Sequence, residues 1–82
     1  MSDDTHHSPS TLDRLIHSAN QIGGFFATQK HDQAVAGTSN HIAKFWDPRM
    51  RQMIFAHLKT GGEGLTPLAR EAIEVLAKKQ TA

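Results

Sequence analysis

The most distinctive charged motif of the chain is the run Phe45-Trp-Asp-Pro-Arg-Met-Arg51. Arg49 and Arg51 place positive charges in or beside the first turn of an expected helix, where the helix dipole favours negative ones. Free amides and guanidinium groups converge at such a helix start, so it can receive a carboxylate of a partner or a phosphate. Four basic residues against one acidic residue give residues 44–59 a net charge of +3. The alternative is a solvated face, or ion pairs to the glutamates within residues 71–74.

Residues suited to catalysis or metal binding are scattered. No nucleophile stands at a readable spacing from a base and an orienting acid. His41 and His57 fall beside or on apolar stripes, so we expect packed or hydrogen-bonded rings there. His6 and His7 form a pair too small for a closed metal site, which needs about four ligands. We therefore predict no catalytic, cofactor-binding or metal-binding residue in this chain.

Cysteine and glycine usage narrows the chemistry further. The chain has no cysteine, which excludes disulfides, thiolate zinc sites, Fe–S ligation and a cysteine nucleophile. The glycine-rich run Gly61-Gly62-Glu63-Gly64 lacks the lysine and the serine or threonine of a phosphate loop. We interpret it as the end of a helix.

Length and composition limit the classes of protein to which the chain can belong. A chain of 82 residues makes one domain, and 38% hydrophobic with 21% charged residues is too apolar to be disordered throughout. The net charge of +1 gives nucleic-acid binding little support. No run approaches the roughly 18 apolar residues of a membrane span, and the start resembles no signal peptide. We expect a soluble, cytoplasmic protein that binds neither nucleic acid nor membrane.

Four segments repeat apolar residues at three- and four-residue steps, as one face of a helix requires. No segment alternates like a strand. We predict an all-α fold, a small bundle or orthogonal array of about four short helices over residues 11–79, after a flexible tail at residues 1–10. The expected helices run roughly over Thr11–Gln29, from the N-cap Asp32 to Trp46, from Pro48 to the glycines at 61–62, and from Pro67 to Lys79.

Helix starts are marked by capping residues. Ser10 with Asp13 three residues on favours a capped start, and both Asp47-Pro48 and Thr66-Pro67 pair a cap with a first-turn proline. Gly23 and Gly24 weaken the first helix by up to about 1 kcal/mol each. Close approach of another backbone would explain them, and a loosened final turn is the alternative.

Two aromatic residues do not fit the inward stripes. Phe25 and Phe55 each point on the order of 100° away from the apolar centre of their helices. Exposed aromatic residues suggest a contact surface, although a small bundle can also bury residues at the flank of a stripe. The inward stripe of the second helix is expected to comprise Val35, Ser39, Ile42, Phe45 and Trp46.

Three sequence blocks together resemble a known family. They are Ala19-Asn-Gln-Ile-Gly-Gly-Phe-Phe26, then Ala34-Val-Ala-Gly37 leading through Asn40-His-Ile42 to Arg51, and last Gly61-Gly-Glu-Gly-Leu-Thr-Pro-Leu68 with Glu71-Ala72. With these blocks the chain resembles the delta subunit of soluble, NAD-dependent, molybdenum-containing formate dehydrogenases. The Lys30-His31 linker departs from the proline-containing turn expected of relatives.

The resemblance implies a non-catalytic accessory subunit that binds the large alpha subunit, and through it the rest of the complex. It would support assembly, stability or loading of the molybdenum cofactor. The partner complex would hold bis-molybdopterin guanine dinucleotide, Fe–S clusters, FMN and NAD, and this chain none of them. We expect partner binding through Phe25, Trp46, Arg49, Arg51 and Phe55.

Two other classes stay open at this point. One is a small helical nucleic-acid binder that uses residues 48–59 as a recognition helix. The other is a homodimer that buries Phe25 and Phe55 against their own copies.

Overall fold

The computed structural model describes the backbone of residues 10–81, and within that range it forms four α-helices and no strand. The all-α prediction is confirmed. The expected tail up to residue 9 and the pair His6 and His7 lie outside the described residues. The helices are α1 Thr11–Phe26, α2 His31–Phe45, α3 Pro48–Lys59 and α4 Pro67–Thr81.

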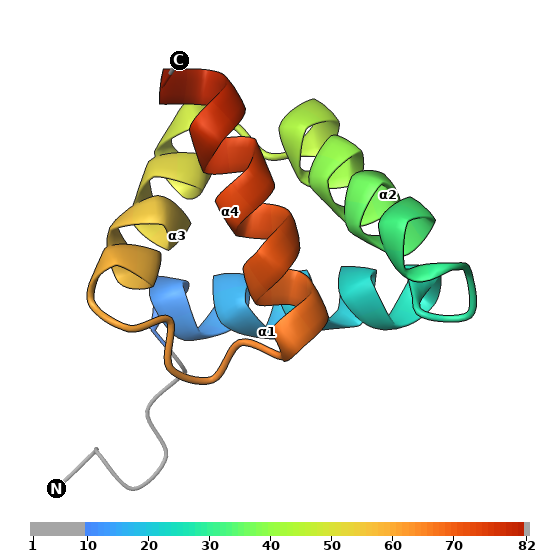
Figure 1. Ribbon diagram of the computed structural model, residues 1–82. Coiled ribbons are helices and arrows are strands. Elements are labelled where there is room, and N and C mark those ends of the chain that lie inside the picture. The colour runs from blue at the N-terminus through green and yellow to red at the C-terminus, as the bar shows by residue number, and fades with distance from the viewer. Residues whose placement is uncertain (1–9, 82) are drawn as a thin grey trace, which may run out of the picture.

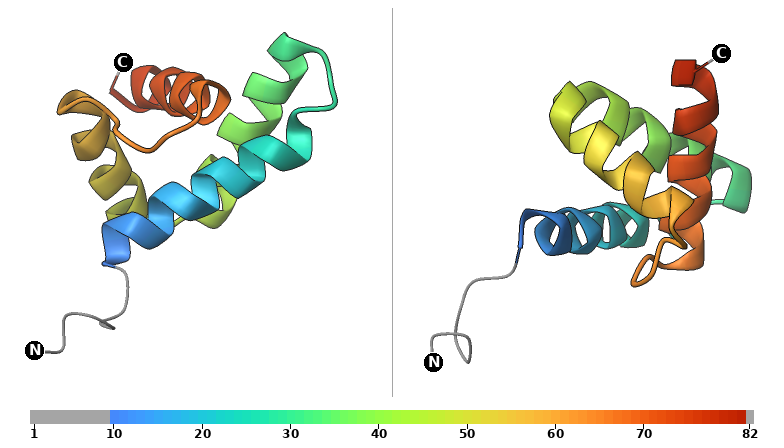
Figure 2. Two further views of the ribbon diagram at one scale, coloured as in Figure 1. Left: turned by 90° about the horizontal axis from the view of Figure 1, so that it is seen from below. Right: turned by 90° about the vertical axis from the view of Figure 1, so that its left-hand side faces the viewer.

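The helices cross at large angles instead of lying parallel (Figure 1). Helix α1 passes beneath the other three, and α4 lies between α2 and α3 (Figure 2). Helices α1 and α4 each pack against all three other helices. The core where they meet is made of Leu15, Ala19, Ile42, Trp46, Ile54, Leu65, Ala69, Ile73 and Leu76.

Three of the helix starts have the predicted caps. The Ser10 hydroxyl accepts from the Asp13 amide at 3.0 Å, and the Asp13 carboxylate accepts from the Ser10 amide at 3.4 Å. The Asp47 carboxylate accepts from the amide of Met50 at 2.9 Å, and the Thr66 hydroxyl accepts from the amide three residues later at 3.2 Å. These contacts satisfy amides that have no partner within the helix.

The start of α2 differs from the prediction. The helix begins at His31, and its N-cap is Lys30, which makes no side-chain cap hydrogen bond. Asp32 lies inside the first turn, where its carboxylate still faces the positive end of the helix dipole. Helix α1 ends at Phe26, three residues before the expected Gln29.

The glycines at 61–62 end α3 as predicted. Both have positive φ, +123° and +65°, which residues with a Cβ rarely adopt. The amide of Gly62 donates to the carbonyl of His57 at 2.9 Å. The guanidinium of Arg70 on α4 donates to the carbonyls of Gly61 and Gly62, so a side chain of the next helix completes this terminus.

Glycine has a packing role at Gly23 and a stricter one at Gly37. A Cβ at Gly23 would lie 3.7 Å from the Ala69 amide nitrogen, so α1 does approach the backbone of α4, at an ordinary contact distance. A Cβ at Gly24 would meet no atom within 4 Å. A Cβ at Gly37 would lie only 2.6 Å from a carbon of the Phe26 ring. Gly37 therefore makes room for Phe26, which the sequence analysis did not anticipate.

Candidate partner-binding surface

Among the described residues, Phe25 and Phe45 are the large hydrophobic residues that are exposed to solvent. Their exposed fractions are 76% and 64%. The exposure expected of Phe25 is confirmed, whereas the inward position expected of Phe45 is wrong. The chain leaves α2 at Trp46, whose extended backbone (ψ 137°) accompanies an indole buried in the core, and the Phe45 ring is left outside.

Both exposed rings belong to one surface formed by α1 and α2. The Phe25 ring meets the Phe26 ring edge-on, with centroids 5.1 Å apart, and the Phe45 ring lies 4.6 Å from the imidazole of His41. A hollow of about 290 Å³ lies between these pairs and is lined by Gln21, Ile22, Phe25, Phe26 and His41. We call the set Ile22, Phe25, Phe26, His41 and Phe45 the aromatic surface.

A positive charge borders the aromatic surface. The Lys44 ammonium lies 5.6 Å from the centroid of the Phe45 ring, a cation–π arrangement. Between Arg14 and Phe45 the sequence has one acidic residue, Asp32, at the far end of α2. Asp47, two residues after Phe45, places a carboxylate at the same end of α2, where it accepts from the amide of Met50. The surface thus combines aromatic rings with a lysine, and the carboxylate nearest to that lysine along the chain serves as a helix cap.

The two arginines of the charged motif have different surroundings. Arg49 is exposed. Arg51 is half-buried, and its guanidinium donates to the carbonyl of Trp46 and, at 3.2 Å, to that of Ala43. These carbonyls close the C-terminal end of α2, where the helix dipole is negative. The guanidinium of Arg51 therefore finds backbone carbonyl oxygens within the chain, and not the carboxylate or phosphate considered from the sequence.

The other two predicted contact residues are buried or half-buried, which for Trp46 confirms its expected position on the inward stripe. Trp46 is 5% exposed and belongs to the core, because its indole fills the space where α2 gives way to α3. Trp46 thus packs in the core and is not available for contact with a partner. Phe55 is half-buried against the core and lines a separate hollow of about 280 Å³ with Gln52, Ala56, Leu58, Lys59 and Ala77. Phe25 and Phe55 thus lie in different hollows.

A comparison with protein families identifies a relationship over most of the chain. Residues 14–73, from the first turn of α1 to the middle of α4, match the model of the NADH-dependent formate dehydrogenase delta subunit FdsD. The chain belongs to this family. No curated protein and no solved structure matches.

The family match confirms the resemblance drawn from the three sequence blocks. The matched range includes the whole aromatic surface, Lys44 and both arginines of the charged motif. The part of the chain that matches the delta-subunit family therefore contains every residue of this surface.

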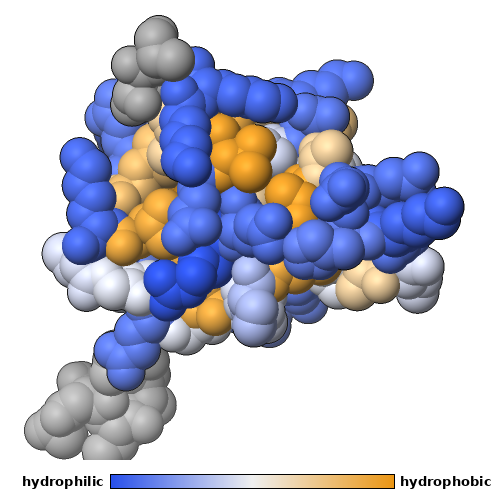
Figure 3. Space-filling model, in the orientation of Figure 1, coloured by the Kyte–Doolittle hydropathy of each residue, from blue (hydrophilic) through white to orange (hydrophobic). Residues whose placement is uncertain are grey.

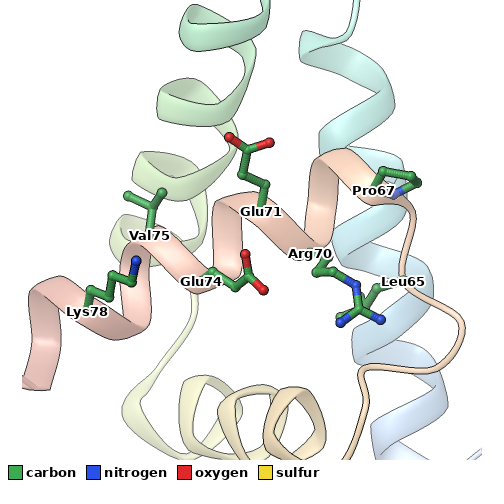
Figure 4. Close-up of a pocket in the computed structure, with 7 residues that line it drawn as sticks. All are labelled: Leu65, Pro67, Arg70, Glu71, Glu74, Val75 and Lys78. Carbon is green, nitrogen blue, oxygen red and sulfur yellow. The ribbon is translucent and has the colours of Figure 1, made fainter.

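Another hollow of this delta-subunit family member lies on the outer side of α4 (Figure 4). It measures about 490 Å³ and is lined by Leu65, Pro67, Val75 and four charged side chains, two of which already have internal roles. Arg70 completes the end of α3, and Glu71 pairs with His31 at 2.8 Å. On the face in Figure 3 a hydrophilic band follows α4, with hydrophobic residues showing on both sides of it.

The described range contains neither a metal-binding cluster nor a membrane-spanning helix. Residues 10–80 contain no group of three histidine, cysteine, aspartate or glutamate side chains arranged to hold a metal ion. None of the four helices is long and apolar enough to cross a bilayer.

Sequence reasoning missed Phe45 and His41 as surface residues. Adjacent residues in a helix point about 100° apart, so the two large rings of Phe45 and Trp46 point in different directions. That adjacency was the available signal. Which ring enters depends on where the helix ends, and the helix ends one residue earlier than the sequence indicated.

Proposed function

We propose that this delta-subunit family member is a non-catalytic accessory subunit. It binds the large alpha subunit of a cytoplasmic formate dehydrogenase and supports the assembly, stability or molybdenum-cofactor loading of that subunit. The observation that carries the proposal is the aromatic surface, where two phenylalanines remain mostly in water. Burying such a side chain stabilises a complex by roughly 1.5–3 kcal/mol, which favours a protein partner.

The cofactors and the chemistry belong, in this proposal, to the partner subunits. The family name describes an NADH-dependent enzyme. The alpha subunit and its partners would hold bis-molybdopterin guanine dinucleotide, Fe–S clusters, FMN and NAD. A chain without cysteine has no thiolate to offer Fe–S clusters or molybdenum.

A small domain also gains from such a complex. A chain of this size buries only about 60–65% of its unfolded surface, so its stability alone is modest. A partner present at 100 times its dissociation constant adds about 2.7 kcal/mol to the free energy of unfolding. The same linkage stabilises the alpha subunit in the conformation that binds this chain.

Co-expression of the tagged chain with the other formate dehydrogenase subunits of the same genome tests the proposal. We expect affinity capture to recover the alpha subunit in stoichiometric amount, and the molybdenum content of the alpha subunit to fall when the chain is omitted. The proposal is wrong if no subunit is captured and the alpha subunit has its full molybdenum content without this chain.

A further inference from the structure

The charge beside the Phe45 end of the aromatic surface is positive on balance, because residues 44–51 carry Lys44, Arg49 and Arg51 against Asp47, whose carboxylate caps α3. Lys44 lies over the Phe45 ring, in the last turn of α2. Asp32 is twelve residues earlier in the same helix, which at 1.5 Å per residue is about 18 Å away. That distance exceeds the Debye length of about 8 Å at physiological salt, so Asp32 does not neutralise Lys44.

The size and lining of the hollow indicate what it receives. Its volume of about 290 Å³ lies just below the roughly 300–1,000 Å³ range of small-molecule sites. Its walls are the side chains of Ile22, Phe25 and Phe26 with the His41 ring, and Gln21 supplies its amide. An apolar side chain from another protein suits it better than a polar metabolite.

A second copy of this chain is a poor occupant. A two-fold dimer places the same patch of both subunits face to face, so the positively charged border of one copy would face that of the other. No carboxylate lines the hollow, and the one nearest to Lys44 along the chain, that of Asp47, already caps α3. Like charges brought together at an interface oppose association.

We infer that the aromatic surface binds an acidic, amphipathic segment of the partner, which inserts an apolar side chain between Phe25 and His41 and places a carboxylate on Lys44. The inference rests on the proposed function and adds the chemistry of the partner segment to it. Ring contacts supply the affinity, and the ion pair sets the register of the segment along α2.

Charge reversal at one lysine, compared with another, tests the inference. Lys44→Glu is compared with Lys79→Glu, because both lysines are exposed and lie in the last turn of a helix. Both variants therefore lose a similar favourable interaction with the helix dipole. Affinity of each purified variant for the co-purified enzyme lacking this chain is measured by biolayer interferometry, at two salt concentrations.

We expect Lys44→Glu to raise the Kd about tenfold or more, Lys44→Gln to have a smaller effect, and Lys79→Glu to change it less than about twofold. The loss caused by Lys44→Glu should shrink at high salt. If the wild-type chain binds and Lys44→Glu binds equally well, the inference fails while the proposed function stands. If the wild-type chain does not bind, the proposed function fails, and the inference with it. A dimer of the isolated chain in sedimentation, lost in Phe45→Ser, would overturn the inference in favour of a second copy.

Discussion

Replacing Gly37 by alanine should destabilise the protein, although alanine is the better helix former. A Cβ at this position would lie 2.6, 2.7 and 3.1 Å from three carbons of the Phe26 ring. Contacts below 3.0 Å force the ring to move. Phe26 lines the hollow of the aromatic surface, so the same change also disturbs the proposed binding site.

The expected magnitude follows from two opposing terms. Glycine to alanine within a helix gains up to about 1 kcal/mol. Inserting a methyl group into occupied space costs about 1–3 kcal/mol. With the full helix gain subtracted, we expect Gly37→Ala to lower the free energy of unfolding by up to about 2 kcal/mol, with Tm falling by about 4–8 °C for each kcal/mol.

Gly24→Ala is the matched control. It is also a helical glycine, but a Cβ there would meet no atom within 4 Å. We expect it to be neutral or to stabilise the protein by up to about 1 kcal/mol. Thermal and urea unfolding followed by circular dichroism measure both variants under the same conditions.

A double-mutant cycle identifies the ring as the cause. Phe26→Ala should cost less in the Gly37→Ala background than in the wild type, with a coupling of about 0.5–3 kcal/mol. The reasoning is refuted if Gly37→Ala is as stable as Gly24→Ala. It is equally refuted if the two substitutions of the cycle are additive.

Three further substitutions test separate parts of the structure. Asp47→Ala removes the acceptor of the Met50 amide and should lower the free energy of unfolding in urea by about 0.5–2 kcal/mol. Asp32→Ala removes no cap and should lower it less; equal losses would contradict the assignment of Asp47 as a cap. Ser39→Ala should be neutral or stabilising by calorimetry, because the hydroxyl is buried and has no hydrogen-bond partner within the described residues; a loss above about 1 kcal/mol would show that it has one. The double substitution of Phe25 and Phe45 by serine should leave Tm nearly unchanged and abolish capture of the alpha subunit, and retained capture would exclude the aromatic surface as the contact.

The helix ends that depend on neighbouring residues were predictable from the sequence. Ser10 and Asp47 each bond an amide three residues away, so the few residues around them contain the whole interaction. Gly61 and Gly62 end α3 because their backbone adopts positive φ, which is again a local property. The all-α class follows from the same local signals together with the apolar periodicity.

Features that depend on contacts between helices could not be predicted. Arg51 finds its acceptors at the end of α2 only because the turn at Asp47 brings α3 back against α2. Gly37 is required only because Phe26, eleven residues earlier, folds back onto α2. The helical period of the sequence predicts neither of these contacts between helices. The exposure of Phe25 was predictable from its position off the apolar stripe of its helix, and the burial of Trp46 from its position on the expected stripe of the second helix.

Site-specific photo-crosslinking tests the central claim most directly. A photoreactive phenylalanine analogue is placed at Phe45 of the tagged chain, or at Lys79 as the control, and the chain is co-expressed with the other formate dehydrogenase subunits before irradiation. We predict a crosslink to the alpha subunit from position 45, mapped to an acidic, amphipathic segment, and none from position 79. An assembled complex in which position 45 gives no crosslink to the alpha subunit would contradict the account.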